Sequence, residues 1–73
     1  MTMPHERSRA IVQTHAFLEQ LSRDASQSEE VRRSAKHLLR HYPCESEVLM
    51  QGRIQEGLAA RYGYQPFLGS KLE

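Results

Sequence analysis

The residues whose types and spacing could do chemistry stand close together near the middle of the chain: His37, His41 and Cys44. Two histidines four positions apart project from one face of a helix, and a cysteine just beyond the helix end could supply a soft ligand that zinc accepts. No fourth ligand is evident, and the cationic side chains of Arg33 and Arg40 beside the histidines oppose a metal ion. The pattern therefore favours solvated histidines over a zinc site, and we expect no cofactor.

Cys44 is also a candidate nucleophile, with His41 near enough along the chain to act as its base. The sequence contains no glycine-rich phosphate loop, no paired-carboxylate arrangement and no nucleophile elbow. A helical chain of 73 residues also leaves little room for a concave pocket. We therefore expect a protein that is not an enzyme and has no catalytic residue.

The histidines belong to a strip of basic side chains on one predicted helix. This candidate binding face consists of Arg32, Arg33, Lys36, His37 and Arg40. Such a strip could follow the phosphates of a nucleic acid, meet an acidic protein surface, or be an ordinary solvated helix face. A helix-turn-helix is disfavoured, because its reading helix would begin with Glu45 and Glu47, where base contacts should lie. The formal net charge of +1 does not indicate a polyanionic partner by itself.

The strip is positioned by the clearest two-faced helix of the chain, which we predict over residues 27–42. Its apolar arc, opposite the basic strip, consists of Val31, Ala35, Leu38, Leu39 and Tyr42. Ser26 and Glu29 have the spacing of a capping box at its start. Pro43 disfavours helical geometry at the residue before it, so the helix must end by Tyr42.

An earlier amphipathic helix is predicted over residues 3–23, with Thr2 as its cap and Pro4 in the first turn. Its apolar arc consists of Ala10, Ile11, Thr14, Phe17, Leu18 and Leu21. Arg7 projects into this arc, and we expect its stem to lie along the core edge while its guanidinium reaches water or a carboxylate. The alternative is a buried functional arginine. The short polar break after this helix predicts an antiparallel hairpin with the next one.

A third helix is predicted over residues 45–62, capped by Cys44 or Ser46 and ended by Gly63 in a left-handed conformation. Its apolar residues fall on two sides, the first of which holds Val48, Gly52 and Ala59. The second side, together with two residues of the following tail, is a possible second contact surface: Met50, Ile54, Leu58, Phe67 and Leu68. This surplus either packs within the chain or meets a second copy of it. Gly52 and Gly57 either permit close packing or mark a kink.

The chain is thus predicted to be all-α, with a small three-helix domain over residues 1–63 and an extended tail over residues 64–73 that is partly docked or flexible. We expect Phe67 or Leu68 to touch the body. The predicted core consists of Ile11, Phe17, Leu18, Leu21, Val31, Ala35, Leu38, Leu39, Val48 and Leu58. A single cysteine forms no internal disulfide, which favours a reducing cytoplasm, and no apolar run approaches the roughly 20 residues that span a bilayer.

Five short segments carry a further pattern: residues 6–10, 17–19, 31–33, 38–43 and 52–54, which read ERSRA, FLE, VRR, LLRHYP and GRI. Together they resemble a family of short, uncharacterised proteobacterial helical proteins, with LLRHYP as the most specific match. The resemblance implies a small cytoplasmic bacterial protein and lends it no activity, substrate or catalytic residue. The resemblance also implies a serine-like helix cap at the position of Cys44, which weakens the case for a ligand or catalytic role of this cysteine.

From these observations we expect a non-catalytic protein–protein interaction or regulatory module, present as a monomer or weak homodimer and without a membrane partner. The alternative is a nucleic-acid-binding module that uses the basic face of the 27–42 helix.

Overall fold

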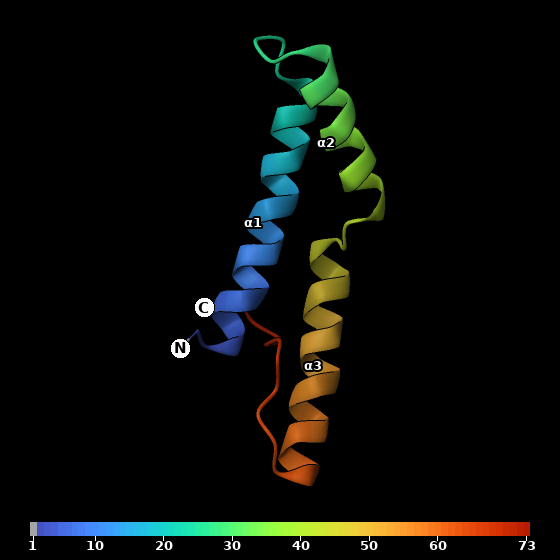
Figure 1. The fold of residues 1–73 in the computed structure, drawn as a ribbon. Helices are drawn as coiled ribbons and strands as arrows, with labels where there is room; N and C mark the ends of the chain where they lie inside the picture. The colour runs from blue at the N-terminus through green and yellow to red at the C-terminus, as the bar shows by residue number, and fades with distance from the viewer. Residues whose placement is uncertain (1) are drawn as a thin grey trace.

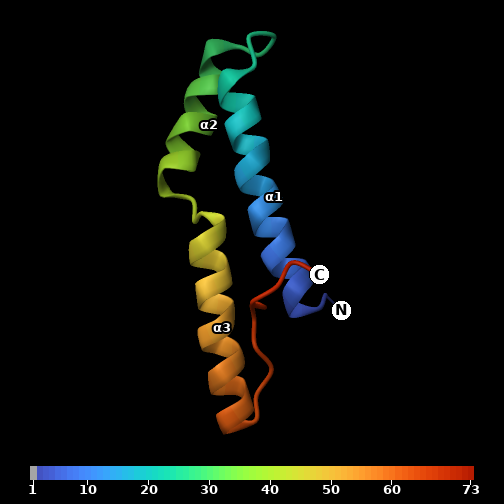
Figure 2. The same cartoon turned by 180° about the vertical axis from the view of Figure 1, so that it is seen from behind.

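Three helices follow one another in a computed structural model that describes residues 2–73. They are α1 (Pro4–Arg23), α2 (Glu29–His41) and α3 (Glu45–Tyr62), and residues 2–73 form no strand, which confirms the predicted all-α fold. Helices α1 and α2 form an antiparallel hairpin, and α3 continues in nearly the direction of α2 (Figures 1 and 2). As a result, α2 covers the C-terminal half of α1, and α3 begins beside the N-terminal half. None of these helices is both long and apolar enough to cross a membrane.

The helices begin and end where local chemistry allows. Met3, not Thr2, caps α1, and its N–H donates to Glu6 Oε1 at 2.9 Å. Ser28, not Ser26, caps α2, because its hydroxyl accepts the Val31 N–H at 3.1 Å. Ser26 instead donates to the Asp24 carboxylate in the preceding turn, and these hydrogen bonds lower the pKa of Asp24.

Helix α3 has the ends that the sequence predicts. Cys44 is its cap residue, and the Cys44 N–H donates to Glu47 Oε1 at 3.0 Å. Gly63 ends the helix with a φ of 73°, a left-handed conformation that side-chain-bearing residues adopt only at a cost.

The molecule is elongated, with extents of 48 × 21 × 16 Å. Its radius of gyration is 15.0 Å, whereas a compact domain of this length has about 11 Å. Its accessible surface is 5564 Å², against about 4,700 Å² for a typical monomer of this mass. The chain therefore exposes about 900 Å² more than a compact fold would.

The buried hydrophobic residues are few: Leu18, Ala35, Val48, Ala59 and Leu68. The core prediction is confirmed for Leu18, Ala35 and Val48, while Ile11, Leu21 and Leu39 are only half-buried. The prediction is wrong for four residues that the structure leaves exposed: Phe17, Val31, Leu38 and Leu58.

Phe17 is exposed because α1 turns a different face inward. Ser8 and Ser22 are buried there beside Leu18, and each serine hydroxyl donates to a backbone carbonyl, Ser8 to Gly69 and Ser22 to Glu19. Small side chains whose hydroxyls are satisfied let the neighbouring segments approach closely. The buried face is therefore rotated by roughly a quarter turn from the apolar arc, which leaves Phe17 outside.

The segment after Gly63 folds back between α1 and α3 (Figures 1 and 2). Leu68 is buried, and its N–H donates to Gln55 Oε1 at 2.8 Å. The Ser70 N–H donates to Glu56 Oε2 at 3.0 Å, and hydrogen bonding from Ser70 lowers the pKa of Glu56. Both partners lie on α3, so this helix holds the tail through its polar side chains.

On α1 the tail meets Arg7 and Ser8. The Ser8 hydroxyl donates to the Gly69 carbonyl at 2.8 Å and accepts the Gly69 N–H at 3.0 Å. The half-buried Arg7 donates from Nη1 to the Phe67 carbonyl at 3.2 Å, and its guanidinium lies 5.1 Å from the centre of the Phe67 ring. Arg7 thus binds the tail, and within residues 2–73 it forms no ion pair with a carboxylate.

Candidate functional site

The structure brings His37 and His41 together but does not add Cys44 to them. The two imidazoles meet edge to face on the exposed surface of α2, with ring centroids 5.7 Å apart. The Cys44 thiol is half-buried, and its Sγ lies 3.2 Å from the Ser46 hydroxyl. Over residues 2–73, no three His, Cys, Asp or Glu side chains are grouped so that they could hold a metal ion.

A chelator should therefore leave the fold unchanged. A structural metal couples ligand binding to folding, so removing it would unfold the helices. We expect the far-ultraviolet circular dichroism of metal-supplemented protein to stay the same when EDTA is added. A large loss of helical signal would restore His37, His41 and Cys44 as ligands.

The basic strip is smaller than the sequence suggests. Arg32 is half-buried, and its Nη1 donates to the carbonyls of Asp24 and Gln27 at 3.3 and 3.0 Å, which fixes the turn between α1 and α2. Arg33 pairs with Glu29 at 3.2 Å on the surface. Within residues 2–73, Lys36 and Arg40 are exposed and make no ion pair.

Replacing Arg33, Lys36 and Arg40 together by glutamine should leave the fold nearly intact. These side chains are exposed, and the Arg33–Glu29 pair is of the kind that contributes about 0–1 kcal/mol. We expect the midpoint of urea unfolding to move little. A loss of several kcal/mol would mean that the strip is part of the folded body.

Two short apolar stripes lie on the surface of the helical hairpin, with Phe17, Val31 and Leu38 exposed and Leu21 half-buried. Phe17 and Leu21 are four residues apart on α1, and Val31 and Leu38 are seven residues apart on α2, so each pair lies along one face of its helix. Phe17 is 58% exposed and Leu38 is 56% exposed. We call these four residues the hairpin stripes.

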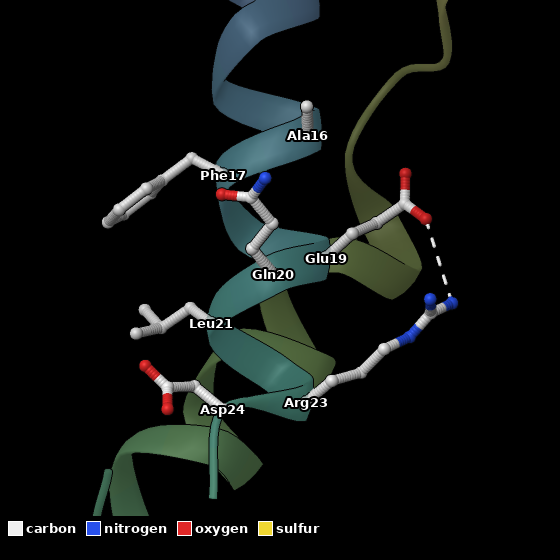
Figure 3. Close-up of a pocket in the computed structure, with 7 residues that line it drawn as sticks. All are labelled: Ala16, Phe17, Glu19, Gln20, Leu21, Arg23 and Asp24. Atoms are coloured by element: carbon white, nitrogen blue, oxygen red, sulfur yellow. Dashed lines mark ion pairs between the residues drawn. The ribbon is translucent and has the colours of Figure 1, made fainter. Parts of the chain in front are cut away.

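The α1 part of the hairpin stripes, Phe17 and Leu21, borders a shallow hollow on the surface of α1 (Figure 3). Phe17 and Leu21 project to one side of the helix, while Glu19 and Arg23 form an ion pair at 3.8 Å on the other. The side chains of this hollow diverge from one helix instead of converging on a point. The hollow therefore offers a surface for contact and no assembled set of reacting groups.

A third apolar stripe runs along α3. Met50, Ile54 and Leu58 are 52%, 48% and 42% exposed, at four-residue spacing. They lie on the side of α3 opposite to the buried Val48 and Ala59. We call them the α3 stripe.

The tail does not cover the α3 stripe, because it docks through Gln55 and Glu56. The predicted second contact surface is thus divided: Leu68 is buried, and Phe67, although exposed, stacks with Arg7 on α1. Intramolecular packing, the first alternative for this stripe, is only partial: Met50 borders a hollow with Ile11 and Leu68, while Ile54 and Leu58 stay exposed.

Two charged residues lie at the ends of the α3 stripe, and the apolar pattern of the sequence does not include them. Glu47 and Arg61 are exposed and lie on the same face as Ile54, each seven residues from it. The hydrogen bond from the Cys44 N–H lowers the pKa of Glu47, so this carboxylate is ionised at neutral pH. Their equal spacing about Ile54 is the signal that could have revealed them.

The candidate site is accordingly a set of surfaces: the hairpin stripes, the α3 stripe, and the cations of α2. His37 and His41 are in contact. Arg32 and Leu68 drop out of the candidate surfaces, because Arg32 donates to a backbone carbonyl and Leu68 is buried. Comparisons of the chain with protein-family models, with curated proteins and with solved structures return no match, so the family resemblance of its LLRHYP segment stays a prediction.

Proposed function

We propose that this protein is a non-catalytic module that acts in the cytoplasm by binding another protein. The observation that carries the proposal is the amount of apolar surface left uncovered. Large hydrophobic side chains such as Phe17 and Leu38 are more than half exposed, and the elongated body exposes about 900 Å² more total surface, polar and apolar together, than a compact monomer. A row of exposed apolar side chains along a helix face is a feature of protein interaction sites.

The hairpin stripes supply the anchors for such a partner. Phe17 is the largest of them, and aromatic side chains dominate the energy of protein interfaces when a partner buries them. Lys36 and Arg40, on another face of α2, would speed the approach of an acidic molecule. The partner that fits is a protein with an apolar helix face and an excess of carboxylates around it.

Nucleic-acid binding is the second candidate function, and the exposed row of Lys36, His37 and Arg40 favours it. Two features reduce its support. Arg32 is occupied by backbone carbonyls, and Arg33 is paired with Glu29, so fewer cations are available to phosphates than the sequence suggests.

The two functions are separated by affinity capture from an extract of the producing cells, with and without nuclease. Three baits are compared: the wild-type chain, Phe17→Ser with Leu38→Ser, and the Arg33, Lys36 and Arg40 glutamine variant. For a protein partner, we expect the complex to survive nuclease and to be lost with the double serine variant, because its exposed anchors are gone. A complex that nuclease and the glutamine substitutions destroy, and that the serine substitutions leave unchanged, would assign nucleic acid instead.

A further inference from the structure

We propose that two copies of this chain associate through the α3 stripe, with the helices antiparallel and a two-fold axis passing beside Ile54. This contact is separate from the hairpin stripes, so it goes beyond the partner binding proposed above. It rests on three observations: the outward position of the stripe, the placement of residues about Ile54, and the excess surface of the elongated chain.

The α3 stripe is self-complementary about Ile54. Met50 and Leu58 are each four residues from Ile54, on opposite sides of it. When two antiparallel α3 helices meet at Ile54, each Met50 faces the Leu58 of the second copy, and the two Ile54 side chains face each other. A two-fold contact of this kind pairs every large apolar residue of the stripe with another one.

The charges at the ends of the stripe match in the same arrangement. Glu47 and Arg61 are each seven residues from Ile54, so the antiparallel pair places Glu47 of one copy beside Arg61 of the other, twice. Neither residue has an ion-pair partner within residues 2–73. A parallel pair would place Glu47 against Glu47 and Arg61 against Arg61, which is repulsive. The charges therefore select the antiparallel orientation.

The surface beside Ile54 is open to a second helix. A Cβ built on Gly57 would meet no atom within 4 Å. The antiparallel arrangement places Gly57 opposite Gln51 of the second copy, so no bulky or charged pair obstructs the approach.

The elongated chain exposes surface that a second copy could cover, and the α3 stripe supplies part of it. A standard interface takes about 800 Å² from each partner, and this chain exposes about 900 Å² more than a compact monomer of its mass. One helix face supplies only part of that area. The dissociation constant should therefore be on the order of micromolar.

The oligomeric state, measured by sedimentation velocity from about 1 to about 300 µM around the expected constant, tests the proposal. The wild-type chain should pass from monomer to dimer, and Ile54→Glu should remain monomeric throughout. Because Ile54 is half exposed, Ile54→Glu should keep the wild-type helical circular dichroism. Phe17→Glu is the matched control, because Phe17 is a somewhat more exposed apolar residue on another helix, and this variant should still form the dimer. A monomeric wild-type chain, or a dimer lost with Phe17→Glu and kept with Ile54→Glu, would overturn the assignment.

Charge reversal tests the orientation. Glu47→Arg and Arg61→Glu should each weaken association about tenfold or more, and the double reversal should restore it relative to Glu47→Arg. The comparison with Glu47→Arg matters because both variants lose the capping hydrogen bond to Cys44 equally. In a parallel dimer, the single reversals would exchange one repulsive pair for another, so unchanged association in both would exclude the antiparallel arrangement.

Discussion

Gly52→Ala is expected to release the C-terminal tail from the body. A Cβ at Gly52 would clash with the carbonyl oxygen of Gly69, which is backbone and is itself held by Ser8. Gly69 cannot retreat freely, because it already lies close to the backbone of His5. Overpacking of this kind costs about 1–3 kcal/mol. Urea unfolding should show this loss, and the amide proton of Gly69 should exchange faster with solvent.

Gly57→Ala provides the matched control on the same helix. Its Cβ would meet nothing within 4 Å, and alanine favours the helix over glycine by roughly 1 kcal/mol. This variant should therefore be as stable as the wild type or more so, when both are compared at concentrations where the chain is monomeric. Equal losses for both variants would show that the tail does not pack against Gly52.

Leu18→Ala should destabilise the fold strongly, whereas Phe17→Ala should hardly affect it. Leu18 is 7% exposed and its neighbour Phe17 is 58% exposed. Truncation of a buried leucine costs about 2–5 kcal/mol, a large part of the stability of a small domain. An exposed substitution usually changes stability by no more than about 0.5 kcal/mol.

The free energy of unfolding of both variants, from urea titrations monitored by circular dichroism, checks this contrast. Leu38→Ala should behave like Phe17→Ala, because Leu38 is also more than half exposed. A loss for Phe17→Ala as large as that for Leu18→Ala would restore the core face that the apolar arc of α1 predicts, because that arc holds both residues.

The sequence predicts the C-terminal ends of α2 and α3 well because these ends depend on local chemistry, whereas it misplaces the caps at the start of α1 and α2. Pro43 ends α2, and Gly63 ends α3, through restrictions that belong to those residues themselves. Which face of a helix is buried depends instead on its neighbours. The apolar arc of α1 would bury Phe17, but the structure buries Ser8, because the returning tail satisfies its hydroxyl from 61 residues away.

The candidate surfaces also combine features that the helical period predicts with features that depend on neighbouring segments. The exposed position of Lys36 and Arg40 follows from the helical period alone. Arg32 belongs to the same basic strip, yet it donates to the carbonyls of Asp24 and Gln27 in the preceding turn. The helical period cannot predict the course of that turn. The α3 stripe was predictable as a surplus of apolar residues, while its exposure depended on where the tail docks.

The contact between Ser8 and Gly69 also bears on the order in which the chain folds. The α1–α2 hairpin needs only a short turn to close, whereas the Ser8–Gly69 hydrogen bonds join residues 61 positions apart. Closing a longer loop costs more chain entropy, and contacts distant in sequence form more slowly than local ones. We therefore expect the hairpin to form first, and the seating of Gly69 against Ser8 to follow and hold α3 beside that pair of helices.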